Sequence, residues 1–478
     1  MTFISIAFIL FFICIVATYY LCPSRFRWAI LLLGSCYFYI VFVPKYIFIL
    51  FFIILVDFIF ALWMERTRGI EKRILFITSL VITVGVLFVF KYFNFFNDNI
   101  GALAHALDWN YSIGALSLIL PLGLSFHTFQ SISYLIEVYR GKYPAERHLG
   151  IYALYIMFFP QLVAGPIERP AHLIPQFKKV VFFQKGKVFS GIRLMAWGFF
   201  KKIVIADRLA LSVNYVYTNI ATVSGPSILF AMFAFAFQLY TDFSGYTDIA
   251  RGSARVLGID LVRNFDQPFF SRSVAEFWRR WHISLSSWFR DYLYYPLVYS
   301  GPRVGMAWLN TCIVITFLVM GLWHGAAWTY IIMGLLFGSY IVLGLLTKTV
   351  RKKCVRILGL NHFPHLVTLL QVATTFILVS IAFVFFRAPS VSSALELLQR
   401  LCIGWDMSIT QFIDSYGIHP FAQLGIKHTD MILTMVFVLI LLVVEKLDTQ
   451  HRVGIFLEKQ SLFIRTVVYC SIVLTIIL

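Results

Sequence analysis

Long apolar runs alternate with short basic loops along most of the chain. A helix needs about 20 predominantly apolar residues to cross a bilayer, and about twelve runs approach or reach that length. The predicted spans are residues 2–21, 27–43, 46–64, 74–93, 112–136, 190–206, 228–250, 305–323, 326–346, 366–386, 431–445 and 463–478. The pattern therefore predicts an all-α polytopic membrane protein.

Two segments depart from the pattern of simple spans. Residues 149–166 are apolar but lie between two basic loops, so we expect them to enter the membrane and return to the same side. Residues 263–300 are rich in both charged and aromatic side chains and are too polar to span. Re-entrant or interfacial helices are expected there, because irregular backbone is tolerated only where it is buried in protein or lines a wet cavity.

Loop charge predicts the orientation of the spans, because Lys and Arg collect in cytoplasmic loops. The basic loops and turns are 25–27, 66–73, 140–147, 178–187, 348–356 and 446–459. Residues 97–110, in contrast, contain Asp98 and Asp108 but no Lys or Arg. Both termini are therefore predicted outside the cytoplasm. Residues 2–21 lack a basic n-region and an A-x-A-like cleavage site, so we expect a retained span rather than a signal peptide.

Composition supports the membrane assignment. Of the 478 residues, 60% are hydrophobic and 13% are charged, against roughly 25% charged in soluble proteins. The net charge of +18 is explained by the basic loops and does not call for nucleic acid as a partner. The seven cysteines are scattered without CxxC spacing, which argues against a disulfide framework or a zinc site.

His324 interrupts the longest uncharged stretch of the chain. Between Arg303 and Lys348 there is no Asp, Glu, Lys or Arg, and His324 is the only imidazole. An ionisable group in the membrane is costly, so it is a functional candidate by default. We expect the small residues of the surrounding GLWHGAAW motif to leave open backbone space around the ring; these are Gly321, Gly325, Ala326 and Ala327.

The densest motif is SVAEFWRRWHISLSSWFRDYLYYPL, residues 273–297. Arg279, Arg280 and Arg290 offer planar cationic forks that suit phosphate. Trp278 adds an amphipathic ring, and His282 lies among these residues. The alternative for this block is an interfacial helix whose arginines meet lipid head groups.

Other polar residues within apolar segments have simpler interpretations. Asp57 is expected to make a polar contact between packed helices, and His127 an interhelical hydrogen bond. Asp242 and Asp248 are expected to pair with Arg251, Arg255 or nearby backbone donors. In the turn GPIERPAHLIPQF, residues 165–177, Arg169 is a candidate anchor.

The motifs and their order carry a family resemblance. They are LPLGLSFHTFQSISYLIEVYRG, GPIERP with PQF, YTDFSGYTDIA, NFDQPFF, EFWRRWHISLSSWFRDYLYYPL, GLWHGAAW and FFRAPSVSSALELL. Together they resemble the membrane-bound O-acyltransferase (MBOAT) family, in the branch of the bacterial alginate and peptidoglycan O-acetyltransferases. The resemblance covers about residues 1–400, and it implies a fold with re-entrant helices around a central tunnel. It implies one integral-membrane domain over 1–478, with N-terminal spans (1–138), a core (139–400) and a C-terminal loop and spans (401–478).

The resemblance also implies a reaction. His324 would be the catalytic histidine and His282 the second motif histidine. Acetyl-CoA would be the acyl donor, bound at Arg279, Arg280, Arg290 and Trp278, with no permanently bound cofactor and no metal. His324 would act as a general base or as a transient acyl carrier.

The partners implied are membrane lipid, a polysaccharide or peptidoglycan acceptor, and a periplasmic SGNH-type acetyltransferase or esterase. The location implied is the bacterial inner membrane. Two other classes stay open from the residues themselves. One is a proton-coupled transporter that uses Asp57, Asp242, His127 and His324 as a relay, although no inverted repeat is visible. The other is a glycan-export subunit in which His324 only satisfies a helix contact.

Overall fold

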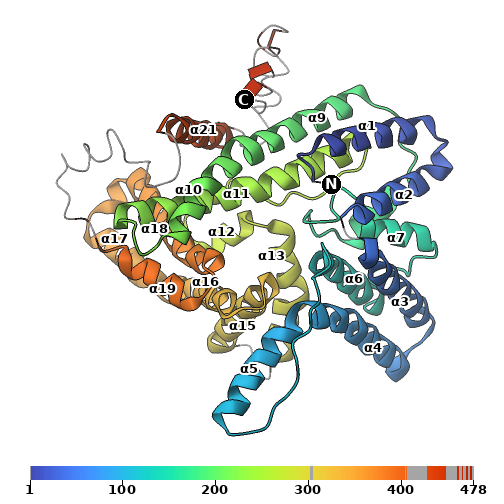
Figure 1. Ribbon diagram of the computed structural model, residues 1–478, viewed down its shortest axis with the longest axis horizontal. Coiled ribbons are helices and arrows are strands. Elements are labelled where there is room, and N and C mark those ends of the chain that lie inside the picture. Colours follow the sequence, from blue (N-terminus) through green and yellow to red (C-terminus); the bar gives the residue numbers. More distant parts are fainter. Residues whose placement is uncertain are drawn as a thin grey trace. The chain divides into compact units, whose positions relative to one another are not determined.

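The computed structural model describes most of the chain and is helical wherever it forms regular structure (Figure 1). It describes residues 2–42, 44–301, 305–403, 405, 428–447 and, near the C-terminus, 460, 461, 464, 466, 470, 471, 474 and 475. Every regular element within these ranges is a helix and none is a strand, which confirms the predicted all-α class. The predicted span 463–478 and basic segment 446–459 lie largely outside the described residues.

Six described helices are long and apolar enough to cross a membrane, so the protein is a multi-pass membrane protein. They are Pro44–Arg66 (containing α3, Ile47–Arg66), Gly69–Ala106 (α4, Gly69–Leu87; η3, Phe88–Tyr92; α5, Phe93–Ala106), α11 (Gly225–Val256), α15 (Met306–His324), α16 (Trp328–Leu346) and α18 (Pro364–Arg387). The apolar helix α1 (Ile6–Leu21) is shorter. The exact number of spans stays a prediction.

The chain forms two compact units. Unit 1 comprises Met1–Met195 and Thr247–Arg263, and unit 2 comprises Ala196–Tyr246 and Asn264–Leu478. Besides the helices already given, unit 1 contains α2 (Arg27–Ile40), α6 (Leu124–Tyr139), α7 (Leu149–Met157), α8 (Pro170–Lys178) and most of α9 (Lys185–Phe199). Helix α11 begins in unit 2 and ends in unit 1.

Buried polar side chains join the helices of unit 1. Asp57 on α3 is fully buried and accepts a hydrogen bond from Thr83 of α4 at 2.8 Å and a longer one from Tyr152 of α7 at 3.4 Å. On α6, His127 donates from Nδ1 to the carbonyl of Ile156 at 3.0 Å. Both residues therefore make the interhelical contacts expected from the sequence.

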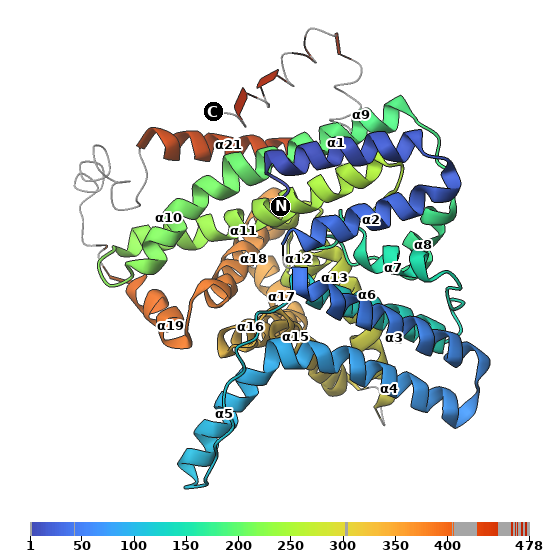
Figure 2. The ribbon, with the colours of Figure 1, turned by 45° about the vertical axis from the view of Figure 1, so that its right-hand side comes forward.

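The predicted span 112–136 is wrong at its start. Helix α6 begins only at Leu124, and residues 110–121 run extended beside α5 (Figure 2). The side chain of Asn94 holds this segment by bonding both the N–H and the C=O of Leu116, at 2.8 and 2.9 Å. Pro121 has no N–H, and Gly123 takes a left-handed conformation (φ 74°) just before α6. The span was predicted from hydrophobicity alone, which does not show that Pro121 and Gly123 mark the start of the helix.

The segment expected to enter the membrane and return does not span it. Helix α7 has nine residues, a length of about 14 Å, and is followed by turns up to Ala164. That is about half of a bilayer's hydrocarbon thickness. The backbone is protected because all side chains from Ile151 to Leu162 are buried.

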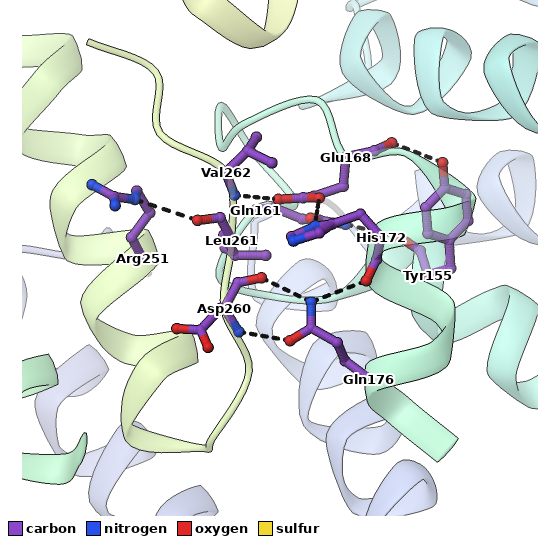
Figure 3. A network of polar contacts seen from close by, with 9 residues as sticks. All are labelled: Tyr155, Gln161, Glu168, His172, Gln176, Arg251, Asp260, Leu261 and Val262. Atoms are coloured by element: carbon purple, nitrogen blue, oxygen red, sulfur yellow. Dashed lines mark hydrogen bonds and ion pairs between the residues drawn. The ribbon is translucent and has the colours of Figure 1, made fainter. Parts of the chain in front are cut away.

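A polar network pins the turn at 165–177 to the segment that follows α11 (Figure 3). The fully buried carboxylate of Glu168 accepts from the N–H of Val262 at 2.6 Å and from Nδ1 of His172 at 2.6 Å. The side chain of Gln176 bonds both the N–H and the C=O of Asp260, each at 2.9 Å. Glu168 and Gln176 are thus anchors that the sequence interpretation missed. The expected anchor, Arg169, is the N-cap residue of α8.

This network predicts a pH-dependent stability. Glu168 raises the pKa of His172 above its ordinary value of about 6.5. The interaction stabilises the fold fully below the ordinary pKa, and the stabilisation is lost as the pH rises through the raised one. His172 is substantially exposed, so solvent screening limits the effect to about 1 kcal/mol or less. The Tm difference between the native protein and His172→Ala should be larger at acidic than at alkaline pH; a constant difference would contradict this account.

Unit 2 contains the WRRWHISLS motif and, besides the long helices given above, several further helices. They are η4 (Phe200–Ala206), α10 (Asp207–Thr218), η5 (Pro268–Phe270), α12 (Val274–Arg280), α13 (Ile283–Phe289), η6 (Arg290–Tyr294), α14 (Tyr295–Ser300), α17 (Lys348–Ile357), η7 (Leu360–His362), α19 (Val391–Arg400) and α21 (His428–Leu447). Between residues 263 and 300, η5 and α12 are separate short helices, whereas α13, η6 and α14 follow one another without a break from Ile283 to Ser300. None of them is among the candidate membrane spans of the described residues. That they are re-entrant or interfacial stays a prediction.

Candidate active site

Helices α15 and α16 form a tight hairpin that carries His324 as the last residue of α15. The two helices cross at glycines. A Cβ added to Gly321 would lie 2.3 Å from the carbonyl oxygen of Tyr330, and one added to Gly334 would lie 2.3 Å from that of Phe317. The expectation of open space around His324 is therefore wrong at Gly321 and Gly325, because Tyr330 fills it.

The imidazole of His324 is partly exposed and lies among aromatic rings. Its centroid is 4.9 Å from that of Trp323 and 5.4 Å from that of Phe386, which meets it edge-on at 77°. Phe386 belongs to α18, within the FFRAP motif of the sequence. The orientation of the His324 ring thus depends on α15 and α18 together.

His282 lies between α12 and α13 in an uncommon backbone conformation. Its φ is 44°, in the left-handed region that non-glycine residues rarely adopt, and its side chain is buried. Phe243 meets its ring at 90° with centroids 4.7 Å apart. Such strain is found preferentially at functional sites, where the surrounding structure holds it in place.

Asn264 contributes to holding His282 in this conformation. Its carbonyl accepts from the N–H of Ile283 at 2.9 Å, and its Oδ1 accepts from the N–H of Ser284 at 3.1 Å. Asp266 adds a third bond, from its N–H to the carbonyl of Arg280 at 2.9 Å. The sequence signal was the NFDQPFF motif, but nothing in the pattern indicated that its asparagine caps the helix after His282.

His282 and His324 both have their rings next to the indole of Trp323. The ring centroid of His282 is 6.1 Å from that of Trp323, the immediate neighbour of His324. Burial lowers the pKa of His282 well below its usual value, and the charge of a protonated His324 lowers it further. His282 is therefore neutral near pH 7, and of the two rings only that of His324 is partly exposed at the protein surface.

The four residues expected to bind the donor have different environments. Arg279 is exposed. Arg280 pairs with Glu276 at 2.7 Å, and Arg290 with Asp291 at 2.9 Å. Trp278 is buried between Phe317 and Phe337, with ring centroids 5.3 and 5.0 Å away. Its environment is that of a core residue rather than of an exposed interfacial ring.

Two acidic residues in the second half of α11 have separate partners. Asp248 pairs with Arg251 at 3.3 Å, as expected. Asp242 instead pairs with Lys202 at 2.8 Å, and Lys202 also bonds Asp207 at 2.8 Å. The expected pairing of Asp242 with Arg251 or Arg255 is not the one formed. Lys202 belongs to the π-helical turn η4, which the sequence pattern did not indicate.

The glycine crossing predicts a matched pair of mutational effects. Gly321→Ala should destabilise the protein by about 1–3 kcal/mol and lower activity, because its Cβ meets backbone that can move only with α16. Gly344→Ala, also in this hairpin, meets nothing within 4 Å and should be neutral or slightly stabilising. Thermal unfolding of both variants in detergent tests the contrast, and equal Tm values would contradict the packing role of Gly321.

Comparison with known proteins now decides the family. The sequence model of the membrane-bound O-acyltransferase family matches residues 147–388, which include both histidines and the α15–α16 hairpin. The chain belongs to this family. It is accordingly an acyltransferase, and the resemblance inferred from the motifs is confirmed.

Two of the following relatives match more than three quarters of this chain, and a third matches less than half of it. The chain is 35% identical to a probable alginate O-acetylase, AlgI, of Pseudomonas aeruginosa over 387 residues, covering 80% of this chain and 71% of the relative. It is 34% identical to a peptidoglycan O-acetyltransferase of Helicobacter pylori over 398 residues, covering 78% and 73%. A teichoic acid D-alanyltransferase of Bacillus subtilis is 32% identical over 229 residues, covering 46% and 57%.

Proposed function

We propose that this MBOAT protein takes an acetyl group from cytoplasmic acetyl-CoA and passes it across the bacterial inner membrane for O-acetylation of a cell-envelope or secreted polysaccharide. The observation that carries the proposal is that the rings of His282 and His324 both contact the indole of Trp323, inside the segment that matches the family model. The names of the relatives support alginate or peptidoglycan as the class of acceptor.

The chemistry assigned to His324 is proton removal. A nitrogen of its neutral ring takes the proton of an acceptor hydroxyl as the oxygen attacks the thioester carbonyl. The C–S bond then breaks, and the CoA sulfur leaves with a proton while the new ester keeps the acetyl group. General-base catalysis of this kind contributes about 10²–10⁴-fold. His282 is buried and neutral, so its proposed role is to orient the donor or the neighbouring indole rather than to exchange protons with solvent.

The direction of transfer follows from the proposed topology. Acetyl-CoA is a cytoplasmic metabolite, and the basic loops lie on the side that we assign to the cytoplasm. Both termini are then periplasmic. A periplasmic SGNH-type esterase-like protein is the proposed partner that completes transfer to sugar hydroxyls. A polymer is too large and polar to enter the membrane, which is why an acetyl relay rather than direct access is proposed.

His324→Ala should reduce O-acetylation of the acceptor polymer by at least about 10²-fold while the protein still accumulates in the membrane. His282→Ala should also reduce it, although by less if the role is positioning. His365→Ala is the matched control, because that imidazole is exposed at the start of α18. Polymer acetyl content by NMR, with membrane abundance by immunoblot, measures the effect, and full acetylation by His324→Ala would overturn the catalytic assignment.

The donor-binding proposal rests chiefly on Arg279, the exposed member of its set. Arg279→Gln should raise the KM for acetyl-CoA about 10-fold with little change in kcat, since one charge-assisted hydrogen bond contributes roughly 1.5 kcal/mol. Arg73→Gln, at another exposed basic position, is the control. An unchanged KM in purified Arg279→Gln protein would refute the contact.

A further inference from the structure

Helix α17, Lys348–Ile357, connects the two candidate spans α16 and α18 but buries none of its side chains. Nine of its ten residues are exposed, and Val355 is half-buried. It contains five cationic residues and no acidic one; they are Lys348, Arg351, Lys352, Lys353 and Arg356. Neither the fold nor the proposed reaction accounts for such a helix.

Most apolar residues at α17 lie on one side, the exception being the half-buried Val355. Val350, Cys354, Ile357 and Leu358 follow the i, i+4, i+7, i+8 spacing of a single helix face. Val350 is 61% exposed, Ile357 71% and Leu358 68%, so this face has little protein against it in the described structure. The cations occupy the opposite face and its two edges, from which long side chains reach polar surroundings.

The flanking helices fix where α17 lies. Helix α16 ends at Leu346 and α18 begins at Pro364, so both candidate spans reach the membrane surface at α17. Arg351 also donates to the carbonyl of Gly344 at 2.5 Å, which satisfies a backbone acceptor in the last turn of α16. A short helix tied to two spans in this way is held at the boundary between hydrocarbon and water.

We propose that α17 is an in-plane membrane-surface helix that binds anionic phospholipid. Its apolar face enters the interface, while its five cations contact the negatively charged head groups. Charge complementarity favours anionic over neutral lipid, and continuity with two spans favours the bilayer over a soluble partner. The helix thereby links the far ends of α16 and α18, whose other ends carry the hairpin of His324 and its contact Phe386. The proposal does not depend on the identity of the acyl group or acceptor.

Cys354 provides a native probe on the apolar face, where it is exposed. The other cysteines would be replaced by alanine in the full-length protein; they are Cys14, Cys22, Cys36, Cys312, Cys402 and Cys470. Cys354 would carry an environment-sensitive fluorophore, and acrylamide, a neutral quencher, would report its access to water. The labelled protein would be compared in nanodiscs of phosphatidylcholine alone and with about 30% phosphatidylglycerol, which creates a negative surface potential.

Quenching should be about 2-fold weaker in the anionic discs, and about 0.5 M NaCl should largely remove the difference by screening. In the variant K348Q/R351Q/K352Q/K353Q/R356Q, quenching should be equal in both discs. The smaller change K352Q/K353Q should lose part of the difference, whereas the control K179Q/K185Q, at exposed sites of another basic loop, should keep all of it.

Three results would overturn the proposal. Equal quenching of the native sequence in both discs would exclude preference for anionic lipid. Protection that is lost when the protein is diluted would place Cys354 against a second copy of the chain. Protection that persists after all five cations are neutralised would exclude the head-group contacts. Size-exclusion profiles identify any variant that fails to fold, and the two-residue variant then provides the test.

Discussion

The hydrocarbon core of the membrane is the constraint on which the rest of this structure depends. Lipid cannot bond backbone N–H and C=O groups, so the described spans are continuous helices, and irregular backbone within the membrane has to be surrounded by protein. Residues 264–289 and the turn after α7 are such places, since few of their side chains are exposed. The motif histidines lie where helices end: His324 closes α15, and His282 precedes α13.

Close packing then positions the two imidazoles. Gly321 and Gly334 bring α15 against α16, and aromatic rings surround both histidines. The backbone bonds from Asn264 support the left-handed conformation of His282. Rigid neighbours of this kind hold a base in one orientation, which is what transfer between a bound donor and an incoming hydroxyl requires.

Much of this could be predicted from the sequence, because hydrophobic runs and motif order are explicit in it. The helical class, the non-spanning segments, and the contacts of Asp57 and His127 followed from such patterns. The extended segment before α6 could not be predicted in this way. It is held by hydrogen bonds from the Asn94 side chain to the backbone of Leu116, and the hydrophobic pattern of the sequence does not indicate such bonds. The Lys202–Asp242 pair and the role of Asn264 depend on tertiary proximity, which spacing along the chain does not reveal. Whether His324 is a base or a carrier is a question of chemistry rather than of pattern.

The most direct test of the account is single-turnover acetyl transfer by the purified protein in liposomes. Acetyl-CoA labelled in its acetyl group would be supplied on the side of the basic loops, and a carbohydrate acceptor with its esterase-like partner on the other. The account predicts labelled ester on the acceptor side and one free CoA per acetyl group, with both products lost in His324→Ala. CoA release and labelled ester at the native rate in His324→Ala would contradict it.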